Sequence, residues 1–156
     1  RTNAAGGFPY TPPVGLIAGL AASIEMLEDE GLDAVYARHH RLAEGVRRAV
    51  AAWGMKPCAA SADLYSDTIT AVLVPDGCNG TDLVQLAATK YGVAFGVGLG
   101  EVAGKVFRIG HLGMLTDVMV LAGLATAEMC MADLGWPVTL GSGVAAAQDY
   151  YRGATV

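Results

Sequence analysis

The stretch GKVFRIGHLG, residues 104–113, places one permanent positive charge inside an otherwise apolar strand. Arg108 stands there between Phe107 and Ile109. A guanidinium stays charged at physiological pH and binds a carboxylate through two parallel hydrogen bonds. Holding it among apolar neighbours is costly unless an anion pairs with it. The pattern allows two interpretations: a receptor for a small acid that enters past the glycine-rich residues 96–100, or a surface-strand Arg paired with one of the fifteen acidic residues.

Hydrophobic periodicity and turn residues on either side of this stretch predict an α+β domain. Apolar residues at helical spacing predict four helices, over residues 13–30, 33–53, 81–90 and 117–133. β-Branched and apolar runs bounded by turn residues predict four strands, over residues 55–59, 68–74, 93–97 and 105–110. The short connections favour a small, mostly antiparallel sheet with helices on one face. Threonines are expected to cap three of the helices: Thr11, Thr81 and Thr116.

Composition limits the classes of function. Apolar content of 53% and charged content of 16% are unusual for a self-sufficient soluble domain, so another domain or subunit is expected to cover part of the surface. A net charge of −5 argues against a nucleic-acid partner. The most apolar region, residues 118–134, is short and contains Glu128 and Asp133, which argues against a membrane span. The basic residues between 38 and 48 are balanced by acids and are expected to form a solvated helix face.

The cysteines, the histidines and the glycine-rich segment each have an ordinary structural interpretation. The three cysteines are widely spaced and form no C-x-x-C pair. Their odd number, without a signal peptide, suggests a reducing compartment, and we expect a cytoplasmic location. His39 and His40 are adjacent and diverge on a helix, so we expect no metal site. The glycines of residues 96–100 lead into a strand, which argues against a phosphate-binding loop. His111 either lines the Arg108 pocket or ends the strand with both ring nitrogens satisfied.

The run GLGEVAGKVFRIGHLG, residues 98–113, resembles the C-terminal signature of the serine–glyoxylate and alanine–glyoxylate aminotransferases, which are class V pyridoxal-phosphate enzymes. Further segments resemble the same family in the same order: residues 8–14, 30–32, 37–44 and 65–75. The resemblance to the serine–glyoxylate branch is better, because Phe8-Pro9 and His111-Leu112 match the sequence motifs of that branch.

The resemblance implies the small C-terminal domain of a fold-type I aminotransferase. Residues 1–12 are then an extended linker from a large cofactor-binding domain, residues 13–135 are the small domain, and the Gly/Ala-rich residues 136–156 are a peripheral tail. Arg108 would bind the substrate carboxylate. Thr11 would contact the phosphate of pyridoxal 5'-phosphate in the neighbouring subunit of a homodimer. Phe8 lies where some members have Tyr, and it has no hydroxyl for that contact.

One departure from the family concerns lysine. The chain has only Lys56, Lys90 and Lys105, and none matches the Schiff-base lysine, which in the family precedes the FPYTP segment. No residue of this chain is therefore expected to be catalytic, and we expect a C-terminal part that is inactive alone.

The complete enzyme is expected to convert L-serine and glyoxylate to hydroxypyruvate and glycine. Alanine–glyoxylate or serine–pyruvate transamination is the alternative within the class. The alternative outside it is a non-catalytic interaction module that retains the fold.

Overall fold

The computed structural model describes residues 3–153. The chain forms two compact units, Arg1–Val35 and Tyr36–Val156. The first unit contains a short 3-10 helix, Asn3–Ala5, and helix α1, Val14–Glu30, which ends at Gly31 as predicted. Thr11 does not cap α1: Pro13 takes the N-cap position and makes no side-chain cap hydrogen bond. Proline disfavours helical backbone at the residue before it, so Pro12-Pro13 delays the helix start beyond Thr11.

Helix α1 buries none of its residues. Seven of its large apolar side chains are exposed: Val14, Leu16, Ile17, Leu20, Ile24, Met26 and Leu27. A helix that is apolar on several faces is normally buried. The first unit therefore presents an apolar surface that the described residues leave uncovered.

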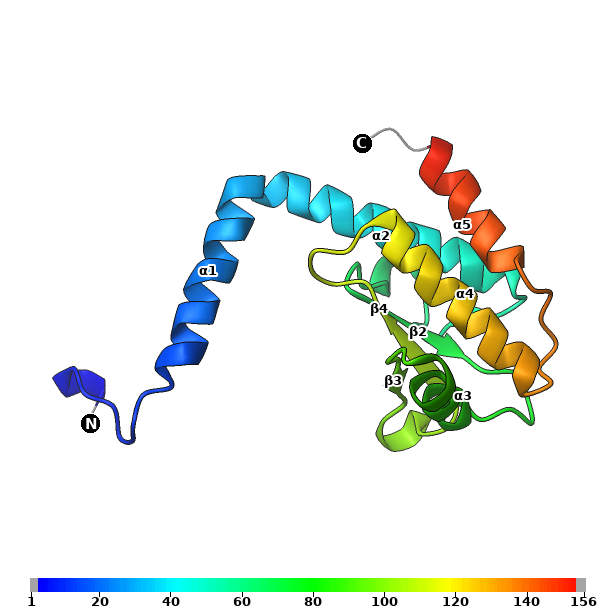
Figure 1. The fold of residues 1–156 in the computed structure, drawn as a ribbon, viewed down its shortest axis with the longest axis horizontal. Helices are drawn as coiled ribbons and strands as arrows, with labels where there is room; N and C mark the ends of the chain where they lie inside the picture. The colour runs from blue at the N-terminus through cyan, green and yellow to red at the C-terminus, as the bar shows by residue number, and fades with distance from the viewer. Residues whose placement is uncertain (1–2, 154–156) are drawn as a thin grey trace. The chain divides into compact units, whose positions relative to one another are not determined.

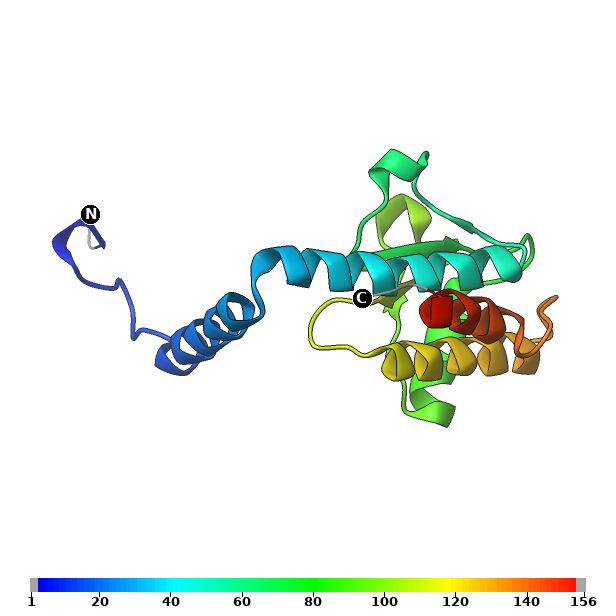
Figure 2. The same ribbon diagram turned by 90° about the horizontal axis from the view of Figure 1, so that it is seen from above.

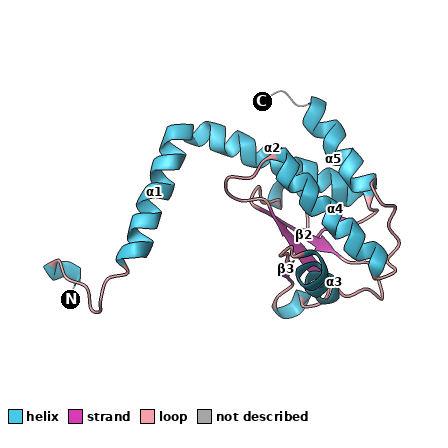
Figure 3. Cartoon of the chain, viewed as in Figure 1, coloured by secondary structure: helices cyan, strands magenta, loops and turns pink. Residues whose placement is uncertain are grey.

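The second unit is built on a four-stranded antiparallel sheet with strand order β1-β2-β4-β3. Figure 3 draws the strands of this sheet in magenta. Its strands are β1 (Lys56–Pro57), β2 (Ile69–Leu73), β3 (Gly96–Val97) and β4 (Val106–Gly110). The predicted α+β class with a small antiparallel sheet is confirmed. The third strand is shorter than predicted, because the Val93 amide donates to the Ala87 carbonyl and completes the preceding helical turn.

Helices cover one face of this sheet. They are α2 (Leu32–Ala52), α3 (Gly80–Leu86, extended by a π-helical turn Ala87–Tyr91), α4 (Asp117–Asp133) and α5 (Ser142–Gly153). Val72, Phe107 and Ile109 point from the sheet into the core that these helices share. Figures 1 and 2 show α2, α4 and α5 packed beside one another over the sheet.

The expectation of a peripheral tail over residues 136–156 is wrong for its described part, where α5 is a component of the core. Ala147 and Tyr151 are buried, and the Tyr151 hydroxyl donates to the Leu42 carbonyl at 2.9 Å. The Tyr151 ring occupies the space that a side chain at Gly45 would need. The buried positions of α5 are Gly143, Ala147 and Tyr151. Because these buried positions hold two small residues and one Tyr, the sequence shows no apolar stripe at helical spacing, and the helix could not be predicted from it.

Two helix starts test the remaining capping predictions. Thr116 caps α4 by accepting from the Met119 amide, as predicted. Asn79, and not Thr81, caps α3: its side chain accepts from the Thr81 amide at 2.9 Å. Asn and Thr are both good caps, so only the position of the preceding loop decides between them.

No helix within residues 3–153 combines the length and the apolar character that crossing a bilayer requires.

Candidate functional site

Arg108 lies on the face of the sheet opposite the core. Side chains alternate along a strand, so Phe107 and Ile109 enter the core while Arg108 points the other way, half-buried. Its neighbours in the paired strands are Ala71 on β2 and Gly96 on β3. Both are small, so neither has a side chain that extends over the guanidinium. β4 is hydrogen-bonded on both edges, which fixes the backbone that carries the guanidinium.

The Arg108 guanidinium makes one internal hydrogen bond. Its Nε–H donates to the Val97 carbonyl at 2.9 Å. Within residues 3–153 the ion pairs involve other basic residues, and no acid pairs with Arg108. The alternative of a surface Arg neutralised by one of the chain's acids is therefore wrong for the described residues. The two terminal nitrogens make no hydrogen bond within residues 3–153, and a guanidinium can bind a carboxylate through two such nitrogens.

The glycine-rich segment lies beside this face. Gly98 packs so tightly on the Val102 carbonyl and the Val106 side chain that a Cβ there would clash with both. The segment then makes a single 3-10 turn, Gly100–Val102, and enters β4. A strand, and not a long helix, follows the glycines, so the arrangement lacks the helix N-terminus of a phosphate-binding loop.

His111 is a satisfied residue at the end of β4 and does not line a substrate pocket. It is fully buried, Nδ1–H donates to the Asp67 carbonyl at 3.0 Å, and Nε2 accepts from the Thr70 hydroxyl at 2.9 Å. Burial lowers the pKa of the imidazole. The neutral ring, with one donor and one acceptor, matches both partners.

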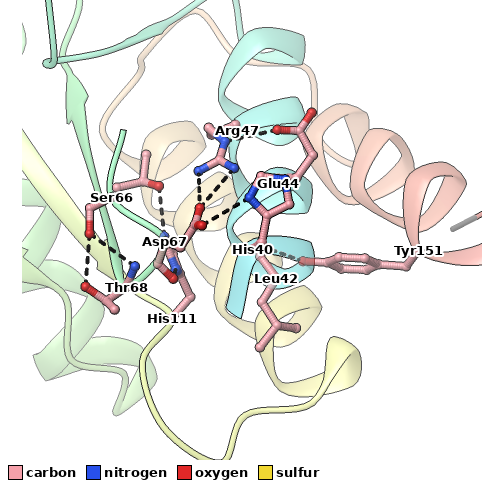
Figure 4. A network of polar contacts seen from close by, with 10 residues as sticks. His40, Leu42, Glu44, Arg47, Ser66, Asp67, Thr68, His111 and Tyr151 are labelled. Carbon is pink, nitrogen blue, oxygen red and sulfur yellow. Dashed lines mark hydrogen bonds and ion pairs between the residues drawn. The ribbon is translucent and has the colours of Figure 1, made fainter. Parts of the chain in front are cut away.

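A polar network holds the segment that leads into β2 (Figure 4). The two carboxylate oxygens of Asp67 have different partners: Oδ1 lies 3.2 Å from Arg47 Nη1, and Oδ2 lies 3.1 Å from His40 Nδ1. Arg47 also pairs with Glu44. The Arg47 side chain is only 10% exposed. The prediction of a solvated basic face on this helix is therefore wrong for Arg47, whose partner Asp67 lies 20 residues away in sequence. It is also wrong for His39, which is 7% exposed, and for Arg41, whose side chain is 17% exposed.

The same helix holds the loop after β4. Arg38 donates to the Gly113 carbonyl at 2.6 Å, and the Gly113 amide donates to His39 Nε2 at 3.0 Å. Two successive residues of α2 thus fix both backbone groups of one glycine, and with them the end of the strand that carries Arg108.

Two residues of the first unit, Thr11 and Phe8, bear on the binding of pyridoxal phosphate. Thr11 is exposed, and its hydroxyl makes no hydrogen bond within residues 3–153, so it fits a phosphate oxygen. Phe8 is also exposed and offers no polar group. The first unit can therefore supply a hydroxyl to such a group.

The lysines do not fit covalent attachment of that cofactor. Lys90 pairs with Asp133 at 2.6 Å, and this hydrogen bond raises its pKa. A lysine nucleophile needs a lowered pKa. Lys56 and Lys105 are exposed at strand ends. The described residues also contain no group of three His, Cys, Asp or Glu side chains arranged to hold a metal ion.

Comparison with known proteins connects this geometry to a family. No family model matches the chain. The chain is 63% identical over 149 residues to an L-aspartate–glyoxylate aminotransferase of Paracoccus denitrificans, across 96% of this chain and 38% of the relative. It is 52% identical over 151 residues to a serine–glyoxylate aminotransferase of Hyphomicrobium methylovorum, across 97% of this chain and 37% of that protein. The chain is related to the C-terminal part of the class V aminotransferases.

The structural comparison agrees with this relationship. The crystal structure of pyridoxamine–pyruvate aminotransferase from Mesorhizobium loti matches with a TM-score of 0.86 and 38% identity, covering 93% of this chain and 37% of that one. The second unit thus has the fold of an aminotransferase C-terminal domain. The chain spans less than two-fifths of the length of the aminotransferases that it matches.

Proposed function

We propose that the complete protein is a pyridoxal-phosphate-dependent aminotransferase that uses glyoxylate as amino acceptor, with Arg108 binding the substrate carboxylate. The observation that carries this proposal is the half-buried Arg108, which pairs with no acid of the described residues. A charge in that position is costly unless an anion arrives to pair with it. Pyridoxal phosphate, when bound, supplies the electron sink for moving the amino group.

Arg108 serves both substrates because an amino acid and a keto acid share the α-carboxylate. The Val97 carbonyl fixes Nε, and the terminal nitrogens then hold the two carboxylate oxygens side by side. This grip orients the carbon that bears the amino or keto group, and orientation of this kind supplies part of the rate enhancement. The lysine and the remaining cofactor contacts belong to the large domain in this proposal.

L-Serine is the donor that we propose, giving hydroxypyruvate and glycine. Three relatives, at 47–52% identity, carry the name serine–glyoxylate aminotransferase. L-Aspartate is the second candidate, because the relative at 63% identity is named for that donor. Alanine is supported less, by a likeness of 26% to an alanine–glyoxylate aminotransferase of Nostoc.

Donor preference is measured with the complete protein, glyoxylate and each amino acid in turn, by quantifying glycine. We expect kcat/KM with L-serine to exceed that with L-aspartate by at least about tenfold, a difference of about 1.4 kcal/mol. The reverse order would assign the aspartate reaction. No glycine from any of the three donors would favour a non-catalytic module and contradict the proposal.

The uncovered apolar side chains of α1 support the proposed partners. Residues 1–12 would connect a large domain, and that domain and the second subunit of a homodimer would bury the apolar side chains of α1. Burial would stabilise them at roughly 25 cal/mol for each Å² of apolar surface removed from water. Thr11, whose hydroxyl is free in the described chain, would reach the cofactor phosphate of the neighbouring subunit.

Thr11→Val should weaken retention of pyridoxal phosphate by the complete protein. One lost hydrogen bond to a charged phosphate is worth about 1.5–3 kcal/mol, or roughly 10- to 150-fold in Kd. Equilibrium dialysis of the cofactor measures it. Thr11→Ser keeps the hydroxyl and is the matched control, with an expected Kd close to that of the wild type. Equal affinity of all three proteins would show that Thr11 makes no phosphate contact.

A further inference from the structure

Gly96, on β3, lies directly beside the Arg108 side chain. A Cβ built at Gly96 would stand 2.9 Å from Nε, 3.1 Å from Cβ and 3.3 Å from Cζ of Arg108. These separations are shorter than van der Waals contact. The bare backbone of Gly96 is thus the surface on which the arginine side chain rests.

The backbone conformation does not explain the glycine. Ten glycines of the described chain have positive φ angles, where other residues are strained, and Gly96 is not among them. Alanine would therefore meet no torsional strain in the backbone at position 96. What excludes a larger residue is the space that Arg108 occupies.

We propose that Gly96 is a positioning residue for Arg108: its missing side chain lets the guanidinium lie flat across β3 with Nε on the Val97 carbonyl. The inference rests on the proposed role of Arg108 as the carboxylate receptor. Two adjacent residues of β3 then fix the position of the guanidinium: the Val97 carbonyl accepts its hydrogen bond, and Gly96 has no Cβ that would occupy its space.

The consequence of adding a methyl group follows from what can move. The Arg108 Cβ is held by the hydrogen bonds of β4 to both neighbouring strands, so its contact with the new methyl group can be relieved only by a small shift of β3. The contacts with Nε and Cζ are relieved by rotation of the arginine side chain about its own torsions. Rotation moves Cζ away from β3 and breaks the bond from Nε to Val97. The terminal nitrogens then no longer face the position of the substrate carboxylate, and both substrates are affected alike.

The test uses Gly96→Ala in the complete protein with Gly110→Ala as matched control. Gly110 lies on β4, on the same face as Arg108, and a Cβ there would meet nothing within 4 Å. We expect Gly96→Ala to lower kcat/KM for the amino donor and for glyoxylate by about 10- to 100-fold, since a displacement near 1 Å has effects of that size. Gly110→Ala should stay within twofold of the wild type.

A binding measurement separates positioning from chemistry. Glycolate carries the carboxylate of glyoxylate but no carbonyl, so it does not react. Titration calorimetry should show a loss of glycolate affinity in Gly96→Ala that matches the loss in kcat/KM. The cofactor absorbance should not change, and the unfolding midpoint should fall only slightly, because the φ angle suits alanine while its methyl group meets the Arg108 Cβ.

A double variant shows whether Gly96 acts through Arg108. In the Arg108→Lys background, adding Gly96→Ala should lower kcat/KM by less than twofold, because the side chain that it displaces is gone. If the losses in kcat/KM of the two substitutions add fully in the double variant, the inference is overturned. It is also overturned if Gly110→Ala loses as much kcat/KM as Gly96→Ala, or if the unfolding midpoint falls in both glycine variants. If Gly96→Ala has normal kinetics while Arg108→Lys has lost efficiency, the inference about Gly96 is overturned and the proposed function stands. Normal kinetics of Arg108→Lys would overturn the proposed function.

Discussion

Arg108→Lys in the complete protein should lower kcat/KM for both the amino donor and glyoxylate by roughly 30- to 1,000-fold, a loss of about 2–4 kcal/mol in transition-state stabilisation. Lysine keeps the positive charge but has a single nitrogen, so it cannot hold two carboxylate oxygens side by side. It also lacks the Nε–H that donates to Val97. Steady-state kinetics with each substrate varied in turn measure the effect.

Arg48→Lys is the matched control for this substitution. Arg48 is exposed and pairs with Glu44 across one helical turn, an interaction worth at most about 1 kcal/mol. Its kinetics should equal those of the wild type. The cofactor absorbance should be the same in both variants. A fall in efficiency for only one of the two substrates would contradict a shared carboxylate receptor.

Glu128→Ala should loosen α5 from the domain by about 3–5 kcal/mol. The carboxylate is 2% exposed and accepts from Trp53 Nε1 at 2.9 Å, from the Gly143 amide at 2.7 Å and from the Gly141 and Val144 amides. Alanine leaves these four donors without their acceptor, and each unsatisfied buried donor costs about 1–3 kcal/mol before water or relaxation compensates. The opening free energy of the α5 amides, measured by hydrogen exchange, should fall accordingly.

Two further variants define the cause of that loss. Glu128→Gln keeps the Oε1 acceptor for three of the donors but presents an NH₂ group to the Gly141 amide, so we expect a smaller loss, about 1–2 kcal/mol. Asp76→Ala removes an exposed acid in a turn and should change the α5 opening energy by less than about 0.5 kcal/mol. A Gln variant as unstable as the Ala variant would show that the charge itself, and not the acceptor geometry, holds α5.

The sequence predicted the strand of Arg108 well, because that prediction depends only on neighbouring residues. Phe107 and Ile109 flank Arg108 at a spacing that puts them on one face and the cation on the other. Gly31 marked the end of α1 for a similarly local reason. Both features follow from a few successive residues.

Features that depend on distant partners were missed. Glu128 looked like a polar interruption of an apolar helix, yet its four donors come from residues 53 and 141–144. Arg47 looked solvated, and its acid Asp67 belongs to another element. The closeness of Gly96 to Arg108 depends on strand register, which no local pattern specifies.

Because the chain is synthesised from its N-terminus, α2 is made well before α5, the helix that packs against it. Ala147 and Tyr151 fill space against α2, which leaves the ribosome about a hundred residues earlier at a rate of roughly 5–20 residues per second. For several seconds Gly45 and the carbonyl of Leu42 therefore lack the Tyr151 side chain that covers them in the folded domain. The core of the nascent domain therefore stays open on that side until α5 emerges.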